Sequence, residues 1–157
     1  MKVLGLSAYA VTSAPNAYDI VSVAFPYQEN RGEPGPKCRP GLVLSKSVHK
    51  ESGTGAPYAT IQVAYGTSSL KVRERYPPWD IFEVHNYVAL QQSGLCQNTC
   101  FVLNRIQKLM WCEEFFPVIG DLETPIMGHL PHEHIISLSK LKEVRDGIRL
   151  ELEAKSQ

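Results

Sequence analysis

Short apolar runs that end at glycine or proline constrain the fold of this chain more than any other feature. The segment 18–26 is rich in β-branched and aromatic residues and ends at Pro26, and the segment 58–65 alternates polar and apolar residues before Gly66. Alternation over a few residues, bounded by such breakers, is typical of half-buried strands. We therefore expect a chain built mainly from short β-strands.

The same reasoning predicts strands at 42–45, 71–73, 81–84 and 99–103, with a polar connection over 46–57. A short helix is expected over 86–93, with Asn86 as its N-cap and Gly94 ending it. After Pro131 the period becomes helical. Apolar residues recur there every three or four positions, at Leu138, Leu141, Val144, Ile148 and Leu152.

These elements predict a mainly β fold, a small barrel with a C-terminal amphipathic helix. A length of 157 residues favours one such core. We expect a loosely attached N-terminal extension over residues 1–16, the barrel domain over 17–130, and a C-terminal helical extension over 131–157. The helical stripe is expected to pack on the barrel or on a second subunit.

The balance of charge excludes a protein that binds nucleic acid through overall basicity. Sixteen basic and sixteen acidic residues cancel. The halves differ, because residues 1–80 hold nine Lys and Arg against six Asp and Glu, whereas residues 81–157 hold seven against ten. A basic first half is compatible with a local site for an anionic ligand.

Four cysteines occur in a chain that is too long and too apolar to depend on disulfides. Cys96 and Cys100 lack a matching second pair, so no metal or cofactor is expected. Free thiols indicate a cytoplasmic protein. The apolar run after Lys2 only weakly resembles a signal peptide. No segment approaches the ~20 apolar residues of a membrane-spanning helix, so no membrane association is expected.

A stiff basic loop, from Pro34 to Pro40, leads directly into the apolar run 42–44. Proline fixes φ and glycine permits unusual φ, so the loop is more rigid than its polarity suggests. Arg39 lies at its end, where a rigid element can direct the guanidinium at a phosphate or carboxylate. The alternative is a solvated arginine on a proline-stiffened loop.

A second polar element, 65–69, follows a predicted strand and combines Gly66 with the hydroxyls of Thr67 and Ser68. Such a turn can bind a phosphate through hydroxyl and backbone N–H donors, although it can equally be an ordinary surface turn. If the two strands are antiparallel, Arg39 and Thr67 lie at the same end of the sheet. An arginine and a hydroxyl without a histidine base suit phosphoryl transfer, and RNA brings its own 2′-hydroxyl as nucleophile.

Other candidate residues have more ordinary interpretations. His129, His132 and His134 lie close in sequence, but no cysteine or carboxylate pattern completes a metal site, and solvated or capping roles are favoured. Trp79, Trp111 and Tyr76 could stack on bases, but such residues more often belong to a core or an interface.

Several segments together resemble the MazF/PemK-like toxins of toxin–antitoxin modules. Tyr18-Asp19-Ile20-Val21 is similar to the opening strand of that family. The run Arg39-Pro40-Gly41-Leu42-Val43-Leu44-Ser45 is similar to its Arg-Pro-x-Leu-Val-Leu-Ser motif, and Tyr65-Gly66-Thr67-Ser68 to the Thr-Ser after its next long strand. Further likeness in 94–103 and 109–116 extends the resemblance over about residues 18–117.

The resemblance implies an SH3-like barrel that forms a homodimer and cleaves single-stranded RNA without a metal. It also implies a cognate antitoxin whose peptide segment covers the active groove. By position, Arg39 would be the catalytic arginine and Thr67 the hydroxyl that steadies the scissile phosphate. Lys37, Ser68 and Glu33 are expected to contact substrate. The alternative is a catalytically inactive SH3-like module that binds a protein or nucleic-acid partner.

Overall fold

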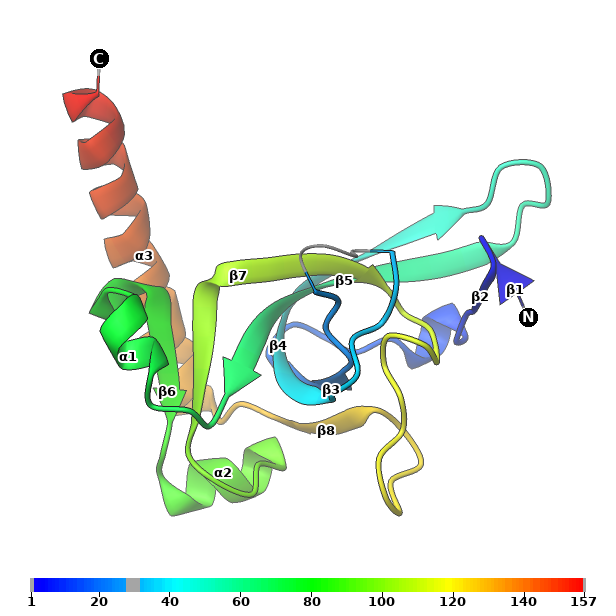
Figure 1. The fold of residues 1–157 in the computed structure, drawn as a ribbon, viewed down its shortest axis with the longest axis horizontal. Helices are drawn as coiled ribbons and strands as arrows, with labels where there is room; N and C mark the ends of the chain where they lie inside the picture. The colour runs from blue at the N-terminus through cyan, green and yellow to red at the C-terminus, as the bar shows by residue number, and fades with distance from the viewer. Residues whose placement is uncertain (1, 28–31, 157) are drawn as a thin grey trace.

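The computed structural model describes residues 2–27 and 32–156 and has one large antiparallel sheet at its centre (Figure 1). Its strand order is β6-β7-β5-β4-β3-β8. The mainly β fold with a C-terminal helix is therefore confirmed. The strands of this sheet are β3 (Asp19–Val23), β4 (Arg39–Lys50), β5 (Pro57–Thr67), β6 (Ile81–Val84), β7 (Thr99–Met110) and β8 (Ile126–His129).

The other elements are short, apart from the last helix. A two-stranded hairpin at the N-terminus joins β1 and β2. The 3₁₀ turns η1 and η3 and three α-helices complete the described chain. Their bounds are β1 (Lys2–Val3), β2 (Leu6–Ser7), η1 (Val11–Ser13), α1 (Val72–Arg75), η3 (Pro78–Asp80), α2 (Tyr87–Ser93) and α3 (His132–Lys155).

The β4–β5 hairpin is longer than the sequence pattern indicated. Its register runs from Gly41 opposite Tyr65 to Lys50 opposite Pro57, so half of the predicted connection 46–57 is strand. The outer half of the hairpin extends away from the body of the molecule (Figure 1). Residues 45–48 are exposed there. A strand that leaves the core needs no apolar alternation, and this is why the pattern did not reveal it.

Side chains on the two faces of the sheet enter two different cores. Val21 and Val63 belong to a cluster that includes Trp111 and Phe116. Their neighbours in sequence, including Ile20 and Ala64, belong to a second cluster beneath α2 and α3. Because successive strand residues point to opposite faces, short strands such as β3 can be buried on both sides.

The N-terminal segment is packed against the sheet, so the expectation of a loosely attached extension is wrong. Val3 is fully buried. The Tyr9 backbone N–H donates to the Trp111 carbonyl at 3.1 Å, and the Tyr9 hydroxyl donates to the Phe116 carbonyl at 2.8 Å. The indole N–H of Trp111 donates to Ser13 Oγ at 3.0 Å. The segment thus covers one core and satisfies its buried polar groups.

Between β5 and β7 the sequence predicted a strand over 71–73 and a helix over 86–93, and only the helix is present. The expected strand over 71–73 is wrong, because Val72–Arg75 forms the helical turn α1, which covers the end of the sheet with Val72. Three residues carry too little periodicity to distinguish the two states. Helix α2 is confirmed. The Asn86 side chain accepts from the N–H of Val88, and Gly94 ends the helix at a φ of 71°.

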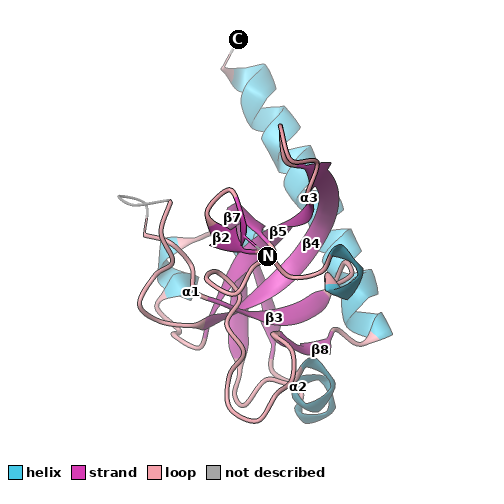
Figure 2. Ribbon diagram, turned by 90° about the vertical axis from the view of Figure 1, so that its right-hand side faces the viewer, coloured by secondary structure: helices cyan, strands magenta, loops and turns pink. Residues whose placement is uncertain are grey.

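Helix α3 begins directly after Pro131, as predicted, but only its first half packs on the sheet. Leu138 is fully buried, whereas Val144 and Leu152 are 53% and 61% exposed. The second half of the helix projects beyond the body of the protein (Figure 2). Packing weakens along the stripe: Arg145 contacts Asp80 in η3 at 3.0 Å, and Ile148, one turn further, is still half-buried beside Trp79.

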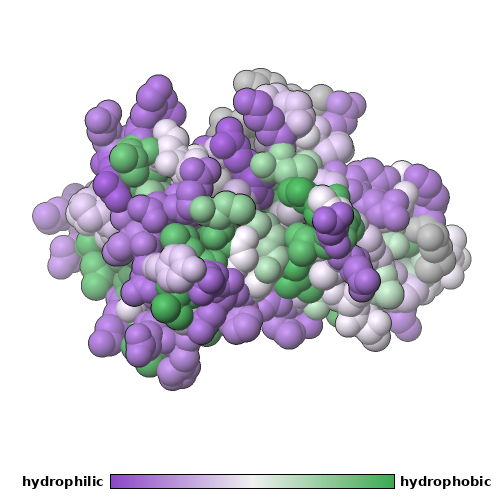
Figure 3. All heavy atoms as spheres, turned by 90° about the horizontal axis from the view of Figure 1, so that it is seen from below, coloured by the Kyte–Doolittle hydropathy of each residue, from purple (hydrophilic) through white to green (hydrophobic). Residues whose placement is uncertain are grey.

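Exposed apolar side chains gather on the face seen from below, where green atoms form a band between purple ones (Figure 3). In Figure 1 this is the side on which α2 lies. Exposed apolar residues of α2 include Tyr87 and Val88. Among the described residues, no helix is both long enough and apolar enough to cross a membrane.

We predict that Trp111→Ala lowers the free energy of unfolding by about 3–5 kcal/mol, because it removes a fully buried side chain that contacts Tyr9 and Phe116. Urea unfolding followed by circular dichroism measures this. Tyr87→Ala, at a side chain that is 73% exposed, is the control and should change stability little. A Trp111→Ala loss below about 1 kcal/mol would contradict a core shared with the N-terminal segment.

Candidate functional site

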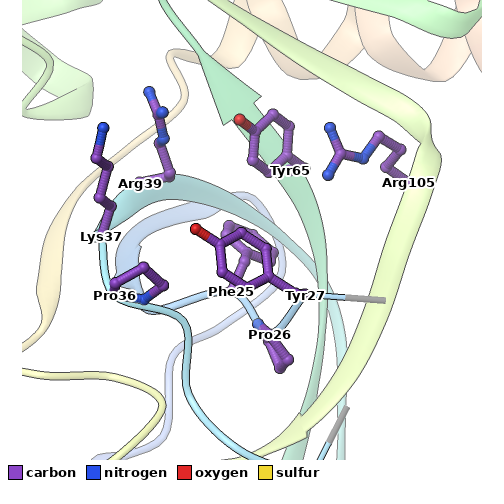
Figure 4. A pocket seen from close by; sticks show the side chains of 8 residues that line it. All are labelled: Phe25, Pro26, Tyr27, Pro36, Lys37, Arg39, Tyr65 and Arg105. Atoms are coloured by element: carbon purple, nitrogen blue, oxygen red, sulfur yellow. The ribbon is translucent and has the colours of Figure 1, made fainter. Parts of the chain in front are cut away.

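A pocket of about 290 Å³ opens beside the start of β4 (Figure 4). Arg39 is the first residue of that strand, and Tyr65 lies near the end of the neighbouring β5. Residues from four segments of the chain meet here. The lining residues are Phe25, Pro26, Tyr27, Pro36, Lys37, Arg39, Tyr65 and Arg105.

The loop before β4 is held tightly, which fixes the backbone that carries Lys37 and Arg39. The Gly35 N–H donates to the Ala24 carbonyl at 3.1 Å. The Gly35 Cα lies so close to the Phe25 carbonyl that no side chain fits there. Pro36 follows directly, with its φ fixed by the ring. The stiff loop predicted from the sequence is therefore present, and glycine at position 35 is required by this close approach.

Arg105 lies in this pocket although no sequence pattern pointed to it. Its Cζ is 3.9 Å from the centre of the Tyr65 ring, a cation–π contact. The Tyr65 ring in turn meets Phe25 edge to face at 5.3 Å between centroids. In Figure 4, Lys37 and Arg39 stand on one side of Tyr65 and Arg105 on the other. Its strand, β7, also contains Asn104, Gln107 and Lys108, so nothing in the sequence set Arg105 apart.

The pocket is strongly basic. It is lined by three cations, and none of its described lining residues is acidic. Within residues 2–27 and 32–156, no carboxylate forms an ion pair with Lys37, Arg39 or Arg105. Carboxylates of the described residues therefore leave the N–H donors of these cations unoccupied. Unpaired cations beside aromatic rings are the combination that binds phosphates and bases of single strands.

Only some of the site residues predicted from the sequence line the pocket. Strands β4 and β5 are antiparallel, so Arg39 and Thr67 do lie at the same end of the sheet. Lys37 lines the pocket with Arg39, whereas Thr67, Ser68 and Glu33 are not among its lining residues. Thr67 is only 4% exposed. Its Oγ1 accepts a hydrogen bond from the Ser69 N–H at 3.1 Å, so in this structure the hydroxyl supports the turn after β5.

Other residues weighed from the sequence lie outside the pocket. No group of three potential metal ligands occurs in the described part of the chain. His134 packs edge to face on Phe82. Trp111 is a core residue, and Trp79 lines a separate hollow beside α3. The charged residues Glu29 and Arg31, which precede the stiff basic loop in sequence, lie outside the described residues.

Glu83 and Cys112 are among the groups whose pKa is shifted, and neither lines the basic pocket. A hydrogen bond from the Arg73 guanidinium lowers the pKa of Glu83. Burial raises the pKa of the Cys112 thiol to about 11. The Glu83 shift comes from a partly exposed ion pair and the Cys112 shift from burial in the core. They do not assign an acid or a base to the basic pocket.

No protein-family model matches this chain, and no curated protein matches it either.

We predict that Gly35→Ala destabilises the protein by about 1–3 kcal/mol, because the added methyl group would collide with the Phe25 backbone. Gly32→Ala in the same loop is the control. A Cβ at position 32 meets nothing within 4 Å, so that change should be neutral or slightly stabilising. Thermal unfolding of the two variants compares them. Equal stability of Gly35→Ala and the parent protein would show that the loop is not clamped.

The thiols should fall into two reactivity classes. Cys38 and Cys96 are exposed, whereas Cys100 and Cys112 are buried. Iodoacetamide at mildly alkaline pH should therefore modify two thiols quickly and the other two only after unfolding, because the reactive thiolate of Cys112 is disfavoured by its raised pKa. Mass spectrometry of peptides identifies the sites. Fast labelling of Cys112 in the folded protein would contradict its burial.

Proposed function

We propose that this protein binds single-stranded RNA in the basic pocket and cleaves it there, as a metal-independent endoribonuclease of the MazF/PemK type on an SH3-like barrel. The observation that carries the proposal is the set of three cations around Tyr65, none of which forms an ion pair with a described carboxylate, with Arg39 at the start of β4 beside the end of β5. The resemblance of the segments around Arg39 and Thr67 to that family supports the same assignment.

Each component of the pocket suits one part of an RNA strand. Lys37 and Arg39 offer charged donors to a phosphate, and arginine can do so with two parallel N–H bonds. The exposed ring of Tyr27 offers a stacking surface for a base. A single strand can present its bases and phosphates to such a pocket, whereas a duplex hides the bases. Single-stranded RNA therefore matches the pocket better than duplex nucleic acid.

Cleavage would proceed by attack of the 2′-oxygen on the neighbouring phosphorus. The 2′-O–P bond forms and the P–O5′ bond breaks, which leaves a 2′,3′-cyclic phosphate and a 5′-hydroxyl. The 2′-hydroxyl proton leaves to water, and the 5′-oxygen takes a proton from water or from Arg39. The main contribution of the protein is the positive charge of Arg39, which stabilises the extra negative charge of the phosphorane.

In this proposal Thr67 contacts the scissile phosphate, with Ser68 beside it and Glu33 at the rim of the same end of the sheet. Thr67 lies beyond Tyr65 on β5, two residues along the same strand face. Its hydroxyl would have to exchange the Ser69 N–H for a phosphate oxygen. A homodimer and a peptide from an antitoxin, which the family resemblance implies, belong to the same proposal, and the apolar band in Figure 3 offers surface for such partners.

The second candidate is a catalytically inactive module that binds a nucleic acid or a protein through this pocket. The observation in its favour is the burial of Thr67 together with the lack of a histidine or carboxylate among the described lining residues. Binding needs only the cations and rings that already line the pocket. The two candidates therefore differ in cleavage and agree on the binding surface.

We predict that Arg39→Ala slows metal-independent cleavage of single-stranded RNA about a hundredfold or more. The negative charge of the phosphorane then lacks the positive charge that stabilises it most. The assay uses gel separation of labelled RNAs of varied sequence in the presence of EDTA. Arg149→Ala, on the projecting half of α3, is the matched control and should cleave as the parent protein does.

Binding is measured separately, with a 2′-O-methyl RNA that cannot be cleaved. Arg39→Ala should weaken it and make the negative slope of log Kobs against log salt shallower by about 0.7, the value for one phosphate contact on a single strand. A parent protein that binds but never cleaves would favour the inactive module. Binding and slope unchanged in Arg39→Ala would overturn the first candidate and the nucleic-acid form of the second.

A further inference from the structure

Arg105 owes its place to an irregularity in β7. Along the β5–β7 ladder, Ala64 lies opposite Ile106, whereas the next residue, Tyr65, lies opposite Val102. Residues 103–105 therefore have no partner on β5, and the β6–β7 register does not include them either. Bulges of this kind bend a strand and redirect its side chains, and they are common beside functional sites. The sharp bend of β7 is visible in Figure 1.

The three residues of the bulge point to different environments. Leu103 is buried in the core beneath α2 and α3, and Asn104 is exposed. Arg105 is half-buried and lies over the Tyr65 ring in the basic pocket. The bulge thus interrupts the regular pairing of β7 and places the Arg105 guanidinium in the basic pocket.

A bulge leaves backbone groups without ladder partners, and here a residue of α3 provides one. The Arg145 Nη2 donates to the Leu103 carbonyl at 3.2 Å, and its Nε donates to Asp80 Oδ1 at 3.0 Å. Both side chains of this ion pair are largely shielded from solvent. Arg145 therefore ties three elements together: the bulge, η3 and the C-terminal helix.

The Arg105 side chain makes few polar contacts with the rest of the described protein, as expected for a residue that binds a ligand. Its one interaction with the described residues is the cation–π contact with Tyr65. That contact uses the face of the guanidinium and leaves the N–H donors at its edge free. An arginine that served only to support the fold would be expected to donate some of these bonds to carbonyls or carboxylates.

We propose that Arg105 contacts a second phosphate of the bound strand, next to the phosphate held by Arg39, and that Arg145 is a positioning residue that acts through the bulge. The proposal rests on the proposed function of the pocket. The C-terminal helix is then a support of the RNA site, even though no residue of α3 lines the pocket. Cations on both sides of Tyr65 fit a strand that passes over this ring.

The test is a double-mutant cycle on binding of the 2′-O-methyl RNA. Arg105→Ala should raise the Kd about tenfold, which corresponds to the free energy of one charged hydrogen bond. It should also make the negative salt slope shallower by about 0.7. Arg145→Gln should weaken binding severalfold. In the Arg105→Ala background the same Arg145→Gln change should have no further effect, because its influence passes through Arg105. Arg149→Gln is the matched control on α3 and should leave binding unchanged.

A purely structural role of Arg145 predicts a different result. Arg145→Gln would then weaken binding equally with or without Arg105, and that additivity would overturn the positioning role. Urea unfolding confirms that each variant is folded at the assay temperature. Normal binding and salt slope in Arg105→Ala, with weakened binding in Arg39→Ala, would refute this inference alone. Unchanged binding in both variants would refute the proposed function as well.

Discussion

The close backbone approach at Gly66 is the constraint on which the rest of this structure depends. A Cβ at this position would collide with the Pro40 carbonyl on one side and with the Phe101 ring on the other. Glycine therefore lets β4, β5 and β7 come together at one end of the sheet. That end holds the start of β4, the end of β5 and the bulge of β7, and the pocket forms there because three strands converge.

Topology also explains how a chain of zero net charge contains a strongly basic pocket. Two of its cations, Lys37 and Arg39, come from the basic first half of the sequence, and the third, Arg105, comes from the acidic second half. Acidic residues of the second half are used elsewhere, for example Glu83 with Arg73. Local potential depends on which side chains the strands bring together, and it is not set by the overall balance of charge.

The elements that the sequence revealed are those whose signals are local. Helix α2 has a cap and a terminating glycine, and β5 alternates up to its end, so both were predictable from neighbouring residues. The outer half of β4 and the turn α1 were not, because the first leaves the core and the second is too short to show a period. Arg105 required the register of β7 against β5, which depends on contacts far apart in the chain.

The site residues also separate into those that local sequence could predict and those that depend on the fold. Arg39 was predictable because a rigid loop and a strand start are sequence features, and its guanidinium does line the pocket. The environment of Thr67 was not predictable, since the Ser69 N–H that engages its hydroxyl is brought there by the fold of the turn after β5. In the proposed function, phosphate binding would need only the charges that the strands already hold in place. Cleavage would also need the Thr67 hydroxyl, which the Ser69 N–H engages in this structure. The turn after β5 would therefore decide whether the pocket only binds RNA or also cleaves it.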